Sequence, residues 1–297
     1  MIQRRSLSIV SAGLLVAVAG LAADRSAALT APTTRTVYVS VTDGKGVPVT
    51  DLGAADLVVK EGGKEREIVR AEPAPGRMRL ALAVEERLVG DGSIRLGMFE
   101  FVKRVAKAAD ISLITIGLSN RTLVDFTADA NNVLDAINKL TLNPRPDSNL
   151  NEGVLEIASR FSEARAERPV LIVVALSGGQ AGVDPRNVLD KLGASAATMH
   201  SVTVEGGASA AGLGSMSEES GREQVLGDGP KQSGGRRHDL TVTSAAPKAL
   251  QQVADDLLAQ YAITYVLPDG VKPNKRFNIS TRRRGVSLRA PSIIPER

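Results

Sequence analysis

The stretch Pro169–Gly179, PVLIVVALSGG, decides the fold. Six of the seven residues in Val170–Leu176 are β-branched or leucine, and no polar residue alternates with them. A strand buried on both faces of a parallel sheet has this composition, whereas a strand with one solvent-exposed face alternates apolar and polar residues. We therefore expect a central parallel strand here. In open α/β sheets ligands bind beyond the carboxyl ends of such strands, so Ser177–Gly179 lie near the expected binding site.

Composition narrows the class of protein. The chain has 297 residues, of which 43% are hydrophobic and 24% charged, which suits one α/β domain with a small accessory module. It contains no cysteine, which excludes disulfides and cysteine-bound zinc. Aromatic residues make up 3%, too few for a site that stacks sugars or bases on rings. The net charge of +4 is nearly balanced, and the basic runs Arg236–His238 and Arg282–Arg284 are interpreted as solvated surface, so no nucleic-acid partner is expected.

Residues 1–23 have the pattern of a secretory signal peptide. Arg4 and Arg5 precede an apolar run from Leu7 to Leu21, and small residues follow up to Ala23. We expect cleavage, export to the periplasm or the cell exterior, and no membrane span in the mature chain. A twin-arginine signal and an uncleaved membrane anchor are the alternatives. The anchor is disfavoured because the apolar run is short and is interrupted by serines and glycines.

Residues 35–70 are predicted to form a small β-sandwich-like module. Thr36–Thr42 alternates at the strand period and is followed by the turn Asp43–Gly46, and two more short strands are expected within Asp56–Lys64 and Glu65–Val69. Three short strands bury too little apolar surface to be stable alone, so the module should pack against a neighbouring part of the protein. Residues 71–76 are the expected linker.

Residues 77–290 alternate strand and helix patterns, which predicts an α/β domain with a Rossmann-like, doubly wound, mostly parallel sheet. Strands are expected at 78–84, 111–116, 122–126, 170–176, 199–204 and 261–267, and helices at 94–108, 129–140, 149–166, 184–193 and 246–260. Residues 276–281 and 286–289 are predicted to close the chain as a β hairpin. Residues 206–239 are rich in Gly and Ser and are predicted to be a flexible insertion.

Several segments of the sequence resemble those of one protein family. Val39–Leu52 and Lys60–Lys64 are similar to the amino-terminal β module of a secreted bacterial subgroup of von Willebrand factor type A (VWA) proteins. Leu257–Tyr265, Phe277–Ile279 and Arg284–Val286 are similar to the subgroup's carboxyl-terminal end. The resemblance implies the strand order 3-2-1-4-5-6. It also implies protein binding through a divalent cation held at the carboxyl ends of the strands, the metal-ion-dependent adhesion site.

That family's metal motif consists of Asp-x-Ser-x-Ser after the first strand, a Thr from a second loop and an Asp after the central strand. Such hard oxygen ligands suit Mg²⁺. If Glu85 takes the first Asp position here, the two hydroxyl positions hold Arg87 and Val89, and if Val84 takes it, they hold Glu86 and Leu88, so neither register supplies the ligands. Ser177 stands where the second Asp is expected. Ser148, followed by Asn149, takes the Thr position.

The resemblance therefore implies a degenerate metal site. Its residues are Glu85, Glu86, Arg87, Ser148, Asn149 and Ser177. The positive charge of Arg87 opposes a cation where the paired acids are missing, so we expect no metal and no other cofactor. A rearranged Mg²⁺ or Mn²⁺ site is the alternative, and it would use Glu85, Glu86, Asp147 and Ser148.

The sequence lacks the motifs that would indicate an enzyme. The sequence carries no nucleophile elbow, phosphate loop or paired-glycine fingerprint. Ser177 is interpreted as a turn residue, His200 as a core or strand-edge residue and His238 as part of the mobile insertion. Glu85 and Glu86 are adjacent on a strand and so point to opposite faces, which argues against an acid/base pair.

We therefore expect an exported, non-enzymatic protein-interaction module that recognises its partner without metal. A metal-dependent adhesion module for an acidic protein ligand is one alternative. A small-molecule or nucleotide binder is another, because a doubly wound sheet suits nucleotides. Gly178 and Gly179 satisfy the phosphate-binding pattern only loosely, since the next helix begins several residues later.

Overall fold

The computed structural model describes residues 33–88, 91–141, 148–179, 182–205, 216–274 and 276–294, with only the backbone described at 216–220. The predicted signal peptide, residues 1–23, lies outside the described residues, and so do residues 206–215 of the predicted insertion. Within the described part of the chain, no helix is long and apolar enough to cross a membrane.

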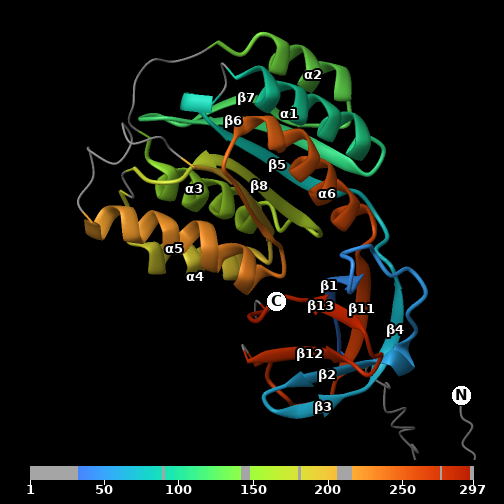
Figure 1. Ribbon diagram of the computed structural model, residues 1–297. Coiled ribbons are helices and arrows are strands. Elements are labelled where there is room, and N and C mark those ends of the chain that lie inside the picture. Colours follow the sequence, from blue (N-terminus) through green and yellow to red (C-terminus); the bar gives the residue numbers. More distant parts are fainter. Residues whose placement is uncertain are drawn as a thin grey trace, which may run out of the picture. The chain divides into compact units, whose positions relative to one another are not determined.

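A six-stranded sheet forms the centre of the α/β region (Figure 1). Its strands are β5 (Met78–Glu85), β6 (Ala109–Ile116), β7 (Arg121–Thr127), β8 (Pro169–Leu176), β9 (Thr198–Val204) and β10 (Arg237–Leu240). The spatial order is β10-β9-β8-β5-β6-β7, and all pairings are parallel except that of β6 with the edge strand β7. Counted from β5, this is the expected order 3-2-1-4-5-6, and the predicted doubly wound class is confirmed.

Three helices cover each face of this sheet (Figure 1). On one face lie α1 (Gly92–Val105), α2 (Ala130–Asn138) and α6 (Ala246–Leu258), and on the other lie α3 (Leu150–Glu163), α4 (Pro185–Ser195) and α5 (Met216–Ser233). Short 3-10 turns precede α1 and α6, at Glu86–Leu88 and Thr243–Ala245.

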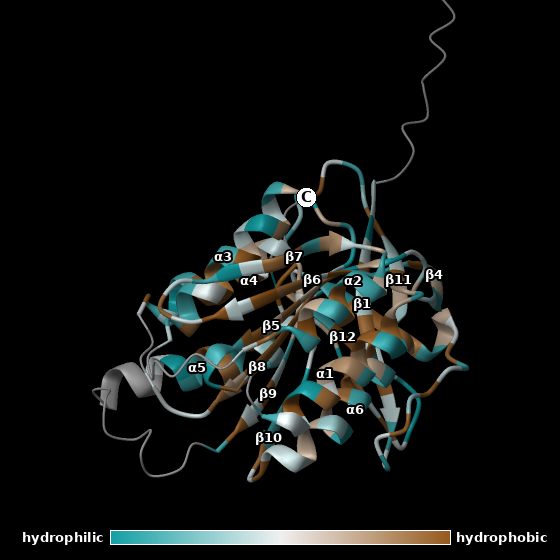
Figure 2. Cartoon of the chain, turned by 90° about the horizontal axis from the view of Figure 1, so that it is seen from above, coloured by the Kyte–Doolittle hydropathy of each residue, from teal (hydrophilic) through white to brown (hydrophobic). Residues whose placement is uncertain are grey.

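Strand β8 lies between β5 and β9, with both of its faces covered. Val170, Ile172 and Val174 pack into the core under α1 and α6. Leu171, Val173 and Ala175 pack into the core under α3, α4 and α5. The apolar run without polar alternation is therefore explained by burial on both sides. Figure 2 shows the strands of this sheet largely in the colour of hydrophobic residues.

The remaining strands form two antiparallel sheets around a separate core. One has the order β13-β1-β11-β4, built from Thr33–Asp43 (β1), Ile68–Pro73 (β4), Tyr261–Leu267 (β11) and Val286–Arg289 (β13). The other has the order β12-β2-β3, built from Leu57–Glu61 (β2), Lys64–Arg66 (β3) and Phe277–Thr281 (β12), and a 3-10 turn at Ala54–Asp56 precedes β2. These sheets bury Val39, Val59, Ile263 and Phe277.

The predicted carboxyl-terminal hairpin is wrong. Strand β12 pairs with β2, and β13 pairs with β1, so the two strands belong to different sheets. Strand β11 also leaves the α/β region and pairs with β1 and β4. The predicted division into 35–70 and 77–290 needs the same correction, because strands from both ends of the chain share one core. The amino-terminal strands β1 to β4 bury too little apolar surface alone, and the carboxyl-terminal strands supply the rest.

The predicted flexible insertion is wrong for residues 216–239. Helix α5 and strand β10 occupy that stretch, and His238 lies on β10 rather than in a loop. The helix forms despite its glycines because Val225 and Leu226 are fully buried against the sheet. Gly229 allows this close approach, since a Cβ there would lie 2.7 Å from the sulfur of Met199.

Candidate functional site

Glu85 is the last residue of β5 and lies at the carboxyl ends of the parallel strands, called the top face below. Its side chain is 0% exposed. One carboxylate oxygen accepts hydrogen bonds from the Ser148 hydroxyl and from Nε of Arg87 at 2.8 Å, and the other accepts from the Leu176 amide at 2.8 Å. Four donors, counting the Arg222 guanidinium described next, therefore surround one buried carboxylate.

Arg222 lies on α5, and its side chain is also 0% exposed. Its Nη2 donates to Glu85 Oε2 at 2.7 Å and to the Leu176 carbonyl at 2.8 Å, and its Nη1 donates to the Ser148 hydroxyl at 3.1 Å. One guanidinium thus joins the end of β5, the segment before α3 and the end of β8. These contacts link segments that lie far apart in the sequence.

Arg87 brings a second guanidinium to the same carboxylate. It lies two residues after Glu85, its Nη2 also donates to the Gly178 carbonyl at 3.3 Å, and its side chain is 13% exposed. Gly179 has φ +116°, and a Cβ at that position would lie 3.2 Å from Arg87 Nη2 and 3.7 Å from Arg222 Nη1. The glycine therefore admits two arginines where a larger residue would be strained. We call Glu85, Arg87, Ser148 and Arg222 the top-face network.

Electrostatics in the network follow from burial and from the two guanidinium groups. Burial alone would raise the pKa of Glu85, but Arg222 and Arg87, with hydrogen bonds from Ser148 and the Leu176 amide, hold it below its ordinary value. Burial lowers the pKa of Arg222, as does Arg87, while Glu85 opposes the shift. Arginine keeps its charge at neutral pH, so the network carries one negative and two positive charges.

Glu86 makes a separate ion pair. It is 6% exposed and accepts from Arg121, the first residue of β7, through Nη2 at 2.6 Å and Nε at 3.1 Å. The Thr115 hydroxyl lies 3.3 Å from the same oxygen. Because Glu85 and Glu86 have different arginine partners, the two carboxylates are not arranged as an acid/base pair.

The structure brings some of the sequence-predicted residues together and leaves others apart. Ser148 contacts Glu85 directly, whereas Asn149 directly precedes α3 without a side-chain capping bond, and its side chain donates to the Leu118 carbonyl at 3.3 Å. Ser177 follows β8, and its amide donates to the Val204 carbonyl at 2.7 Å. Arg222 was missed by the sequence reasoning, although it precedes the apolar pair Val225 and Leu226 at helical spacing, which is a usable signal of one buried helix face.

No group of three or more histidine or acidic side chains in the described ranges is placed to hold a metal ion. The oxygens of Glu85 and Ser148 are the motif-related oxygen atoms that meet at the top face, and guanidinium groups already contact both.

Comparison with known proteins identifies the α/β region. Residues 89–228 match the family model described as the von Willebrand factor type A domain. No curated protein sequence matches the chain.

Solved structures with a similar fold were also found. Proximal thread matrix protein 1 from the mussel byssus, solved with zinc in its MIDAS motif, has 14% identity and a TM-score of 0.49, over 65% of this chain and 48% of that chain. The human COPII-coat protein Sec24c has 7% identity and a TM-score of 0.48, over 74% and 44%. An aerotolerance-related membrane protein from Bacteroides fragilis has 10% identity and a TM-score of 0.42, over 61% and 99%.

This chain therefore spans about half the length of the mussel protein. At these identities the likeness concerns the fold alone. The chain carries a von Willebrand factor type A domain, a protein-interaction or adhesion module, over residues 89–228.

Proposed function

We propose that this protein is an exported, non-enzymatic interaction module whose top face binds a protein partner without a divalent cation. One observation carries the proposal: the buried guanidinium of Arg222 contacts the three segments that supply metal ligands in the family motif. A positive group fixed to the chain thus takes the position in the network that a cation would need.

The described residues at the top face do not fit Mg²⁺ or Mn²⁺, and Asp147 of the rearranged alternative lies outside the described residues. These ions need several oxygen ligands with carboxylates among them. Glu85 is the single carboxylate in the network, and two arginines already neutralise it and leave a surplus positive charge. Repulsion between two unit positive charges at 4 Å is about 4 kcal/mol at an effective dielectric constant of about 20, and a divalent ion doubles it.

The network also supplies what a bound metal would otherwise provide, which is cross-linking of the top-face segments. Arg222 connects the ends of β5 and β8 and the start of α3 in a fixed arrangement. Preorganised loops lose less conformational freedom when a partner binds. Leu118 is 46% exposed and the Arg121 side chain 59% exposed beside this network, and they offer an apolar and a charged contact.

Export and the absence of enzymatic activity rest on the sequence. The pattern of residues 1–23 supports a signal peptide. Glu85 and Ser148 are the top-face groups that could act as a base or a nucleophile. Both already take part in ion pairs and hydrogen bonds within the network, which supports recognition rather than catalysis.

Affinity capture from the native envelope fraction tests the proposal. The protein, immobilised in buffer with EDTA and again with Mg²⁺, should retain the same partner in both. Leu118→Asp should abolish the capture. The matched control is Leu258→Asp on α6, which changes a leucine of similar exposure, 44%, at the opposite end of the strands and should have no effect. A partner that is retained only with Mg²⁺, or equally by both variants, would overturn the proposal.

A further inference from the structure

Both histidines of the chain lie on one face of the six-stranded sheet. His200 on β9 pairs with Ile172 of β8, and His238 on β10 pairs with Val202 of β9. Paired residues in parallel strands share a face, and Ile172 and Val202 both belong to the core under α6. Both imidazoles therefore face α6.

His200 is buried and His238 is half-buried, and three of their four ring nitrogens are buried without a hydrogen-bond partner in the described part of the chain. His200 is 0% exposed, and neither of its ring nitrogens has a partner in the described part of the chain. The same holds for Nε2 of His238. A Cβ at Gly235 would lie 3.2 Å from Cδ2 of His200 and 1.8 Å from the Met199 carbonyl oxygen, so the chain packs directly against this ring. A buried imidazole in such surroundings is disfavoured in its charged form.

The charges around the rings oppose protonation as well. Asp256 on α6 is buried and accepts from Arg289 of β13 at 2.8 Å, with Arg236 at 3.6 Å. We call His200, His238, Arg236, Asp256 and Arg289 the histidine cluster, and its permanent charges sum to +1. Strand β9 adds no other charged group, and the nearby acid Asp239 of β10 is engaged by Thr203 and Arg237.

Burial, followed by the charges of Arg289, His238 and Arg236, holds the pKa of His200 well below its usual value. Burial, with Arg236 and Arg289, lowers the pKa of His238 to about 4, although Asp239 opposes the shift. Both imidazoles are therefore neutral at pH 7.

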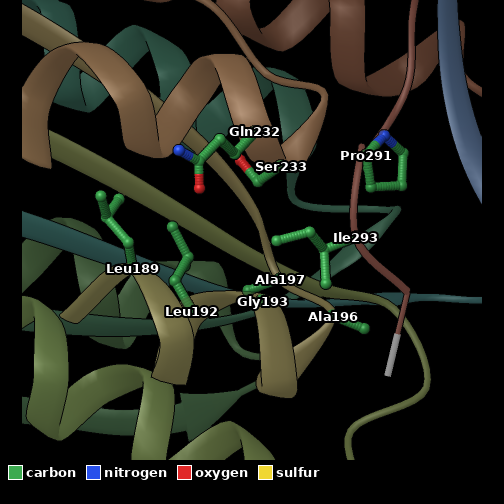
Figure 3. A pocket seen from close by; sticks show the side chains of 9 residues that line it. All are labelled: Leu189, Leu192, Gly193, Ala196, Ala197, Gln232, Ser233, Pro291 and Ile293. Carbon is green, nitrogen blue, oxygen red and sulfur yellow. The ribbon is translucent and has the colours of Figure 1, made fainter. Parts of the chain in front are cut away.

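The histidine cluster also anchors the end of the chain. Arg289 is the last residue of β13, and the Ser292 amide beyond it donates to the Gln232 carbonyl of α5 at 2.8 Å. Figure 3 shows Pro291 and Ile293 facing Leu189 and Leu192 of α4 across a small cavity. We call residues 290–294 the tail. The pair of Arg289 with Asp256 thus holds β13 and the tail against the α/β region.

We propose that the histidine cluster is an acid-sensitive clasp, in which protonation of His200 and His238 detaches β13 and the tail from α5 and α6. Each proton adds a positive charge to a partly buried cluster that already carries a surplus positive charge. The Arg289 and Arg236 side chains are 18% and 28% exposed and can turn toward water, whereas His200 cannot. Release of Arg289 from Asp256 is therefore the change that relieves the added positive charge at the lowest free-energy cost.

The direction of the pH effect follows from the lowered pKa values. The unfolded chain or opened clasp binds protons near pH 6.5, and the closed clasp does not, so closure is fully favoured above pH 6.5 and is lost on acidification. The equilibrium constant for opening should rise up to about tenfold per pH unit for each histidine. Ordinary carboxylates titrate mainly below about pH 5, so measurements between pH 5 and 6.5 isolate the histidines.

Proton NMR of the protein, prepared without a histidine tag, tests the first step. The chain contains two histidines, so two imidazole signals are expected, and His238→Gln assigns them. Both should titrate below the usual imidazole range around pH 6.5 in the closed form, with a pKa of about 4 for His238. A signal that titrates near pH 6.5 without any change in the amides of β13 would overturn the proposal.

Hydrogen exchange at pH 7.5 and 5.5, corrected for intrinsic rates, tests the opening. Exchange should accelerate at least tenfold in β13 and at Ser292, while β5 and β8 stay protected. The double variant His200→Met/His238→Gln should lose this pH dependence, and His238→Gln alone should lose about half of it on a logarithmic scale if the double variant does not fold. Equal acceleration in β8, or an unchanged pH dependence in these variants, would refute the clasp.

Discussion

Replacing Arg222 by methionine probes the top-face network most sharply. The change removes three hydrogen bonds and leaves Glu85 buried with a single guanidinium partner. Removing one partner of a buried ion pair costs about 3–5 kcal/mol. Because Arg87, Ser148 and the Leu176 amide still contact the carboxylate, we expect the lower part of that range, about 3 kcal/mol, in the free energy of unfolding. Urea unfolding followed by far-ultraviolet circular dichroism at pH 7.5 measures it.

The matched control is Arg186→Met. That side chain is 84% exposed and lies 3.8 Å from Asp184, so its loss should change the free energy of unfolding by less than about 0.5 kcal/mol. In a double-mutant cycle of Arg222→Met with Glu85→Gln, the two effects should fall short of additivity by about 1.5–3 kcal/mol. A loss below about 1 kcal/mol for Arg222→Met, or full additivity, would refute the network as a stabilising element.

Three further changes test the fold that carries the site. Gly235→Ala should lower the free energy of unfolding by about 3 kcal/mol in the same urea assay, because the added Cβ would overlap the Met199 carbonyl. The control is Gly44→Ala, where nothing lies within 4 Å of the added Cβ, and it should change the free energy of unfolding by less than about 0.5 kcal/mol. Asp91→Ala removes the side chain that caps α1 and should cost about 1 kcal/mol, measured by thermal unfolding. Ile172 lies on β8 and is fully buried, so Ile172→Ala leaves a cavity and should lower the free energy of unfolding by about 2–5 kcal/mol. A loss below about 1 kcal/mol would contradict the central position of β8.

The central sheet could be predicted because its signals are local. Val170–Leu176 shows double-sided burial in its own composition, and the alternation of strands and helices fixes a doubly wound class. The pairing of the last strands is not local. Residues 277–281 and 286–289 are close in sequence and suggest a hairpin, yet each pairs with an amino-terminal strand that completes a core.

Helix α5 was missed for a different reason. Its glycines and Pro230 have low helix propensity, and tertiary packing overrides that preference through the burial of Val225 and Leu226. Arg222, the one member of the top-face network that the sequence analysis did not predict, lies on the same helix. Glu85 and Ser148 follow from the motif, but the guanidinium that joins them comes from a residue 137 positions beyond Glu85. The spacing of Arg222 to Val225 and Leu226 indicates one buried helix face, but it does not indicate the contact with Glu85.

Isothermal titration calorimetry with Mn²⁺ and Mg²⁺ tests the central claim most directly. The protein, without a histidine tag, should give no binding heat up to millimolar ion, and Ser148→Ala should behave identically. Ser159→Ala on α3, whose hydroxyl donates to the Leu155 carbonyl within the helix, is the matched control. Micromolar binding that Ser148→Ala abolishes and Ser159→Ala preserves would contradict a top face organised by Arg222 in place of a metal.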